Sequence, residues 1–141
     1  MILLLLVSIT DIKEFRIPNS ILGTFILIRG GILIYEVSHK TVYIDNVVKT
    51  LILMIGIFII GVLIKVISHG GIGFGDVKLL ICVVAYVGYE VGVRIIYNSI
   101  FIIGVINSIS LVLRVKTRKD IVPFAPAVLL GALFQIVIAL L

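Results

Sequence analysis

The chain alternates between long apolar runs and short polar connections. Apolar residues dominate six segments, at positions 2–10, 17–37, 47–67, 77–93, 95–113 and 121–141. All but the first have a length of about 17–25 residues, which is what a helix needs to cross a bilayer. The first run is short even if its helix continues through Phe15, so we expect it to tilt, to thin the bilayer locally or to be incompletely inserted. The pattern predicts an all-α, polytopic membrane protein with about six transmembrane helices.

Composition favours this class over a soluble domain. Hydrophobic residues make up 62% of the chain and charged residues 13%, whereas ordinary soluble domains carry about 25% charged residues. A β-barrel is excluded because barrel strands alternate apolar and polar residues, and these runs are apolar on every face. A cleaved signal peptide is disfavoured because no basic residue precedes the first run. We expect one membrane domain over residues 1–141.

The distribution of basic residues predicts the topology, because membrane proteins retain positive charge on the cytoplasmic side. One set of connections carries Lys13, Arg16, Lys65, Lys78, Arg114, Lys116, Arg118 and Lys119. The other set carries Lys40, Lys49 and Arg94. We therefore expect a multi-pass protein of the cytoplasmic membrane with both termini outside.

Two aspartates stand at the ends of apolar runs. Asp11 follows the first run, and Asp76 follows a glycine-rich connection. A charged group at mid-span costs roughly 2.5–3.5 kcal/mol on insertion scales, so an acid in such a setting usually does chemistry or moves an ion. The predicted topology puts both aspartates on the cytoplasmic side, where their helices can pack together. Two carboxylates in one site can share a proton and hydrolyse a peptide bond through water, with the proton belonging to the pair.

Residues around the two aspartates carry a family resemblance. Asp11 is followed by Arg16, Ile17, Pro18 and Asn19, and Asp76 closes a Gly73-Phe74-Gly75-Asp76 segment. A third motif, Val122-Pro123-Phe124-Ala125-Pro126, enters the last run. In this order and on this hydropathy profile, the motifs resemble the type IV prepilin peptidase family.

The resemblance implies a GxGD intramembrane aspartyl protease fold and an aspartic endopeptidase with Asp11 and Asp76 as the catalytic pair. Its substrates would be type IV prepilin-like, tight-adherence pilin or preflagellin-like proteins, whose leader is removed at the cytoplasmic face. The chain is similar to the short, peptidase-only members, because it shows no N-terminal extension with paired cysteines. We expect no methyltransferase activity.

Other motif residues have supporting roles in this interpretation. Gly73 and Gly75 let the chain break its helix before Asp76, and Phe74 and Lys78 complete the expected active-site loop. Lys78 either biases the charge of Asp76 or reaches the interface. The remaining expected roles are ordering of the loop after Asp11 for Arg16 and Asn19, a helix start for Pro18, a break in the last span for Pro123 and Pro126, and an acidic substrate contact for Glu14.

The sequence also bears on cofactors, partners and alternative functions. No cofactor and no metal are expected, because the single Cys82 lies in an apolar run and cannot form a multi-cysteine site. The expected partners are the substrate and membrane lipids, and not nucleic acid, because topology accounts for the net charge of +5. Arg29, inside the second run, has no assigned partner. Two alternatives stay open: a proton-coupled or ion transporter that uses the two aspartates, and a non-catalytic assembly factor. The oligomeric state is not predicted.

Overall fold

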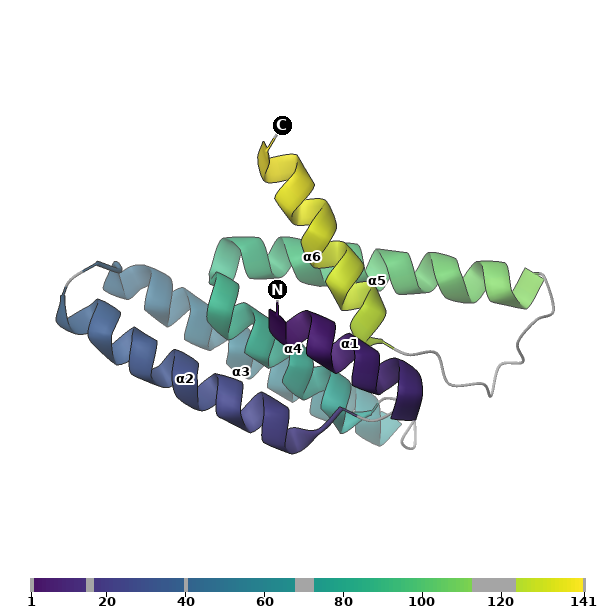
Figure 1. The fold of residues 1–141 in the computed structure, drawn as a ribbon, viewed down its shortest axis with the longest axis horizontal. Coiled ribbons are helices and arrows are strands. Elements are labelled where there is room, and N and C mark those ends of the chain that lie inside the picture. The colour runs from purple at the N-terminus through teal and green to yellow at the C-terminus, as the bar shows by residue number, and fades with distance from the viewer. Residues whose placement is uncertain (1, 15–16, 40, 68–72, 113–123, 141) are drawn as a thin grey trace. The chain divides into compact units, whose positions relative to one another are not determined.

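The computed structural model describes residues 2–14, 17–39, 41–67, 73–112 and 124–140 (Figure 1). These residues form six α-helices and no strand, which confirms the predicted all-α class. The helices are α1 (Ile2–Glu14), α2 (Asn19–Ser38), α3 (Ile44–Ile67), α4 (Phe74–Val87), α5 (Tyr89–Val112) and α6 (Ala125–Leu140). Each helix coincides with most of one of the six apolar runs.

The boundary between the fourth and fifth helices differs from the prediction. The sequence pattern placed it at Arg94, because a charge interrupts the apolar run there. In the structure α4 ends at Val87, and Gly88 adopts a positive φ of 82°. Glycine populates this region readily and commonly ends helices. Arg94 lies inside α5, since one arginine does not break a helix.

Three helices are long and apolar enough to cross a membrane, namely α2, α3 and the Tyr89–Ile109 part of α5. Ile2–Ile12 and Ala125–Leu140 are shorter apolar helices. Large aliphatic side chains on α3 face outward, with exposed fractions of 63% for Ile52 and 58% for Ile60. A helix that is apolar on its exposed side suits lipid rather than water. The 14 residues of α4 span only about 21 Å at 1.5 Å per residue, which is shorter than the hydrocarbon core.

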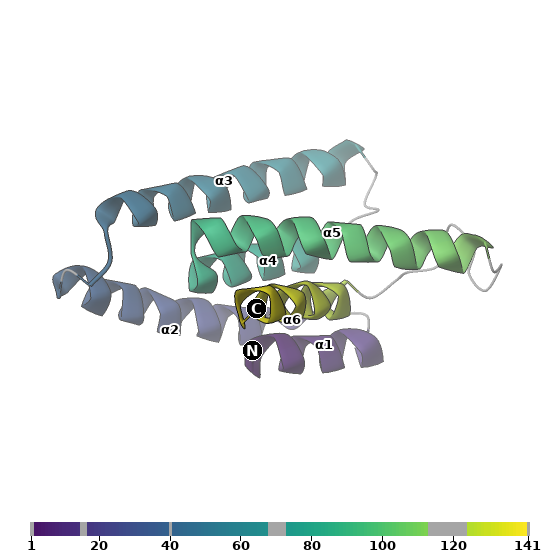
Figure 2. The same ribbon diagram turned by 90° about the horizontal axis from the view of Figure 1, so that it is seen from above.

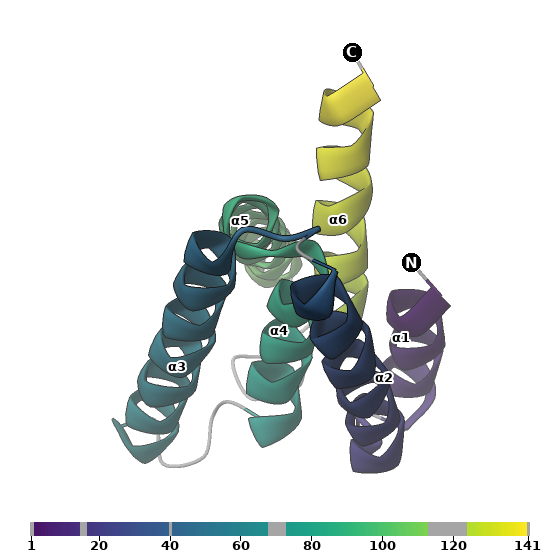
Figure 3. The ribbon, with the colours of Figure 1, turned by 90° about the vertical axis from the view of Figure 1, so that its left-hand side faces the viewer.

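The chain divides into two compact units, and the first comprises Ile17–Val93. Here α4 lies between α2 and α3 and packs against both (Figure 3). The buried side of α4 consists of Val77, Leu79, Cys82, Val83 and Val84. Gly61 of α3 lets that helix approach closely, because a Cβ there would lie 2.6 Å from both methyl groups of Val77.

The second unit comprises Met1–Arg16 and Arg94–Leu141. α1 packs along α6 (Figure 2). The buried stripe of α1 has helical spacing and consists of Leu3, Leu4, Val7, Ser8 and Asp11. α6 contacts α5 at Gly131, where a Cβ would lie 2.6 Å from Ser99 Oγ and 3.1 Å from the Ser99 backbone nitrogen. That all 141 residues act as one membrane domain stays a prediction.

The contact at Gly131 gives a stability prediction. Gly131→Ala should destabilise the protein by about 1–3 kcal/mol, because its methyl group has to displace backbone atoms of α5. The matched control is Gly104→Ala on α5, where nothing lies within 4 Å of the added carbon. There the better helix propensity of alanine should raise stability slightly. Thermal unfolding in detergent measures both variants, and an equal response would contradict the close contact.

Candidate active site

Asp76 lies in the first turn of α4. Gly73 precedes the helix in an extended conformation, with φ −67° and ψ 132°, and its carbonyl accepts the Asp76 N–H at 3.1 Å. The carboxylate turns back toward this glycine, since a Cβ on Gly73 would lie 3.3 Å from Asp76 Oδ2. A negative charge is favourable at the positive end of a helix dipole. The helix start therefore provides a suitable place for an ionised carboxylate.

Gly75 has a different role from the predicted one. We expected Gly73 and Gly75 together to break the helix before Asp76, but α4 begins at Phe74 and includes Gly75. A Cβ on Gly75 would lie 3.1 Å from the Cβ of Ile17. The glycine therefore allows the segment before α2 to approach the first turn of α4. Lack of a side chain, rather than unusual backbone angles, is what this position requires.

A hydrogen bond joins the same two motifs. Lys78 Nζ donates to Asn19 Oδ1 at 3.0 Å, so the lysine side chain contacts the start of α2. Asn19 is the first residue of α2, directly after Pro18, whose φ of −64° suits a helix start. Pro18 is thus the residue that caps the start of α2. The Asn19 amide and Gly75 thus fix the start of α2 against the start of α4.

The ring of Phe74 gathers further side chains around the start of α4. Lys65 Nζ lies 4.7 Å and Lys78 Nζ 5.5 Å from the ring centroid. Phe58 packs its edge against the same ring, with centroids 6.0 Å apart. Cations are attracted to the face of an aromatic ring. The expected loop residue Phe74 therefore places two ammonium groups near the turn that carries Asp76.

Asp11 lies on α1, and only 5% of its surface is exposed. Its Oδ2 accepts the backbone N–H of Ala125 at 2.9 Å, in a buried hydrogen bond. Ala125 is the first residue of α6, where backbone N–H groups lack partners within the helix. Pro126 follows in the first turn, a position at which proline is tolerated because its missing N–H would have no helical partner. The third motif therefore binds Asp11 through its backbone.

Some predicted residues are not placed by the structure. Arg16 and Pro123 lie outside the described residues, and so does the side chain of Glu14. Asp11 belongs to one compact unit and Asp76 to the other, so their meeting stays a prediction. Within the described residues, no group of three or more His, Cys, Asp or Glu side chains is placed to hold a metal ion.

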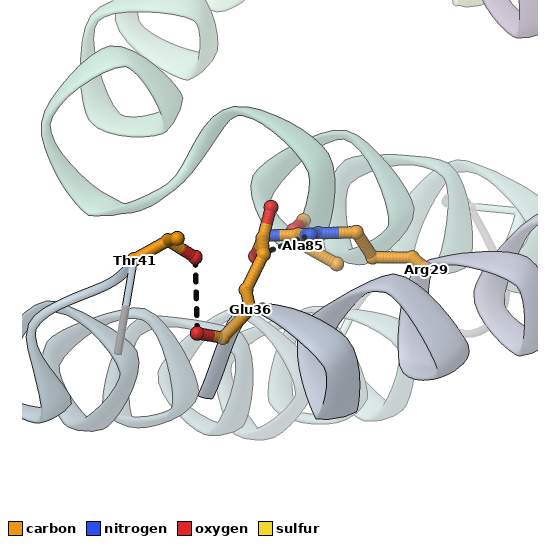
Figure 4. Close-up of polar contacts among 4 residues, drawn as sticks. All are labelled: Arg29, Glu36, Thr41 and Ala85. Carbon is orange, nitrogen blue, oxygen red and sulfur yellow. Dashed lines mark hydrogen bonds and ion pairs between the residues drawn. The ribbon is translucent and has the colours of Figure 1, made fainter. Parts of the chain in front are cut away.

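Arg29 has partners that sequence reasoning did not assign. Its Nη1 lies 2.9 Å from Glu36 Oε2, and its Nε donates to the carbonyl of Ala85 at 2.7 Å (Figure 4). The Thr41 hydroxyl donates to the backbone carbonyl of Glu36 at 3.0 Å. Ala85 lies in the last turn of α4, where carbonyls lack helical partners and favour a cation. Arg29 therefore joins α2 to the end of α4.

A cavity of about 460 Å³ lies beside this cluster. Its polar lining comes from Arg29, Asn46, Thr50, Tyr86, Tyr89 and Glu90. It adjoins the C-terminal end of α4, whereas Asp76 is at the N-terminal end of the same helix. The cavity and Asp76 are therefore at opposite ends of α4. The signal in the sequence that could have found the ion pair is the spacing of seven residues, which puts Arg29 and Glu36 on the same face of a helix.

The ion pair gives a second stability prediction. Arg29→Met should lower the free energy of unfolding by about 2–4 kcal/mol, because it leaves the Glu36 carboxylate and the Ala85 carbonyl without their donor. Adding Glu36→Leu should recover part of that loss by removing the unpaired charge. Lys49→Met is the control, since its pair with Asp45 is exposed and contributes little. Urea unfolding in micelles would contradict this account if the double variant were less stable than Arg29→Met.

Comparison with known proteins supports the family resemblance that the three sequence motifs indicate. Residues 1–141 match the type IV leader peptidase family. Over 135 residues the chain is 30% identical to a prepilin leader peptidase/N-methyltransferase of Bacillus subtilis (strain 168), in an alignment that covers 93% of this chain and 50% of the relative. The chain thus spans about half the length of that curated relative. No solved structure gives a significant match. Because the family match extends over the whole chain, this membrane protein belongs to the type IV leader peptidase family.

Proposed function

We propose that this chain is an intramembrane aspartic endopeptidase that removes the leader of type IV prepilin-like proteins. Family membership supports peptidase activity, and a relative named as a prepilin leader peptidase supports the substrate class. The observation that carries the proposal is the setting of Asp11. The residue is 5% exposed on an apolar helix, and its carboxylate accepts a hydrogen bond from the start of α6. Such a costly group is expected where it does chemistry.

In the proposed reaction, Asp11 and Asp76 act on one water molecule. The ionised aspartate takes a proton from the water as the water oxygen bonds to the scissile carbonyl carbon. The protonated partner gives its proton to the carbonyl oxygen, which stabilises the tetrahedral intermediate. The carbon–nitrogen bond then breaks as the leaving amine takes a proton from the pair, and a hydroxyl group of the intermediate returns a proton to the pair as the new carboxyl group forms. No covalent enzyme intermediate forms, and acid and base roles alternate within the pair.

The substrate would enter as a basic leader followed by an apolar helix. The predicted topology puts both aspartates at the cytoplasmic face of the cytoplasmic membrane, with both termini outside. The lysines near Phe74 repel a basic leader, so recognition would rest on the apolar helix and on local acids such as Glu14. Of the two activities in the relative's name, we propose only peptidase activity for this chain.

The aspartate pair gives the test of this function. Asp11→Asn and Asp76→Asn should each lower cleavage of a co-expressed prepilin-like substrate by about 10²–10⁴-fold, because asparagine keeps the shape but does not accept the proton. Asparagine at position 11 can still accept the Ala125 N–H, so folding should survive. Cleavage is followed as a mobility shift, and the cut site is mapped by mass spectrometry.

The control is Asp45→Asn on the exposed pair of α3, which should cleave normally. Normal cleavage by either active-site variant, at wild-type expression in the membrane, would rule out the two-aspartate mechanism. If the wild type failed to cleave prepilin-like substrates, the result would favour the transporter and assembly-factor alternatives over a peptidase.

A further inference from the structure

The hydroxyl group of Ser8 is a buried polar group without a protein partner. Ser8 lies on α1 in the stripe that includes Asp11, and only 4% of its surface is exposed. Its Oγ atom forms no hydrogen bond with any residue that the structure describes. A buried hydroxyl in this state costs about 1–3 kcal/mol, so it needs an explanation.

Other helical hydroxyls show the alternative that was open to Ser8. In this protein they commonly donate to a carbonyl one turn back in their own helix, as do Thr10, Thr24, Ser38, Thr50, Ser99 and Ser108. This bond is the usual way for serine or threonine to be satisfied inside a helix. Ser8 does not make it, so its hydroxyl group is available to another partner.

Asp11 is the nearest polar neighbour on the same stripe. Residues three apart on a helix have Cβ atoms about 5–6 Å apart. The Ala125 N–H occupies Oδ2 of Asp11, and a carboxylate accepts further hydrogen bonds on its two oxygens. One water molecule can join two oxygens up to about 5.5 Å apart through bonds of about 2.8 Å. Buried waters typically have 2–4 polar partners, and Ser8 and Asp11 supply two.

We propose that Ser8 Oγ and the Asp11 carboxylate hold a water molecule between them. Resting on the proposed function, this is the water that hydrolyses the leader peptide bond. One O–H of the water donates to Asp11 and passes its proton there as the oxygen bonds to the scissile carbonyl carbon. The other O–H donates to Ser8, which keeps its own proton and orients the water. Ser8 thereby becomes a further residue of the proposed active site.

The test compares catalysis with stability in Ser8→Ala. We expect kcat to fall about 10–100-fold, the factor that corresponds to one lost hydrogen bond, with KM within about twofold because the water does not bind the leader. The Tm should stay equal or rise, because a buried hydroxyl without a protein partner has been removed. A serine that only packs against α6 would not lower kcat while leaving Tm unchanged.

Two further variants sharpen the comparison. Ser8→Thr keeps a hydroxyl group and should recover part of the lost kcat. Ser99→Ala removes a buried hydroxyl of the same unit that bonds its own helix at 2.6 Å, and it should leave kcat unchanged. An unaltered kcat in Ser8→Ala, with wild-type and Asp11→Asn controls behaving as expected, would overturn the assignment.

A direct readout separates this inference from the proposed function. A crystal structure that resolves waters should show one within hydrogen-bond distance of Ser8 Oγ and Asp11 in the wild type, and none there in Ser8→Ala. Ordered density without that water would overturn the inference even for an active peptidase. Conversely, a wild type that cleaves no prepilin-like substrate would remove the proposed function, and the water would still be decided by the density.

Discussion

The structure depends on one constraint, which is that polar groups at membrane depth have to be satisfied within the protein. The carbonyls of the last turn of α4 lack partners within their own helix and need donors from elsewhere in the protein. Arg29 supplies one to Ala85 at 2.7 Å, and its charge is balanced by Glu36. The buried Asp11 carboxylate meets the same need through the Ala125 N–H. Helical hydroxyls such as that of Ser99 bond to their own backbone. Against this pattern, the unsatisfied hydroxyl of Ser8 indicates a place where something else binds.

Both candidate catalytic carboxylates are associated with helix starts, but in different ways. Asp76 belongs to the first turn of its own helix and turns toward Gly73. Asp11 lies near the end of α1 and bonds the start of α6, 114 positions away in sequence. Helix N-termini favour negative charge, so each start is a favourable place for a carboxylate. The three sequence motifs also acquire distinct physical roles. The first and second are joined through Gly75 and the Lys78–Asn19 bond, and the third holds Asp11.

The sequence pattern predicted the six helices well because each apolar run is long and continuous. It misplaced the boundary at Gly88 because charge is a more visible signal than a glycine in an apolar run, although the glycine's positive φ ends the helix. It identified Gly75 as important but gave the wrong reason, since a close approach to Ile17 depends on a residue far away in sequence. Asp11 and Arg29 bond to backbone atoms of Ala125 and Ala85. Every residue has these backbone atoms, so the sequence does not show which of them bind a side chain. The state of the Ser8 hydroxyl likewise depends on what surrounds it in space.

The central claim is that Asp11 and Asp76 meet in one site, and cysteine cross-linking tests it most directly. Asp11→Cys and Asp76→Cys are combined in a Cys82→Ala background, with a protease site inserted at position 40 so that only a cross-link keeps the halves together. A short bifunctional thiol reagent is used, because two carboxylates that share a water hold their Cβ atoms farther apart than the about 3.5–4.5 Å of a direct disulfide. We predict that the reagent links the halves in the membrane, and that the control pair Asp11→Cys with Asp45→Cys, at the start of α3, stays unlinked. No link between positions 11 and 76, under conditions that link a positive-control pair, would contradict the account.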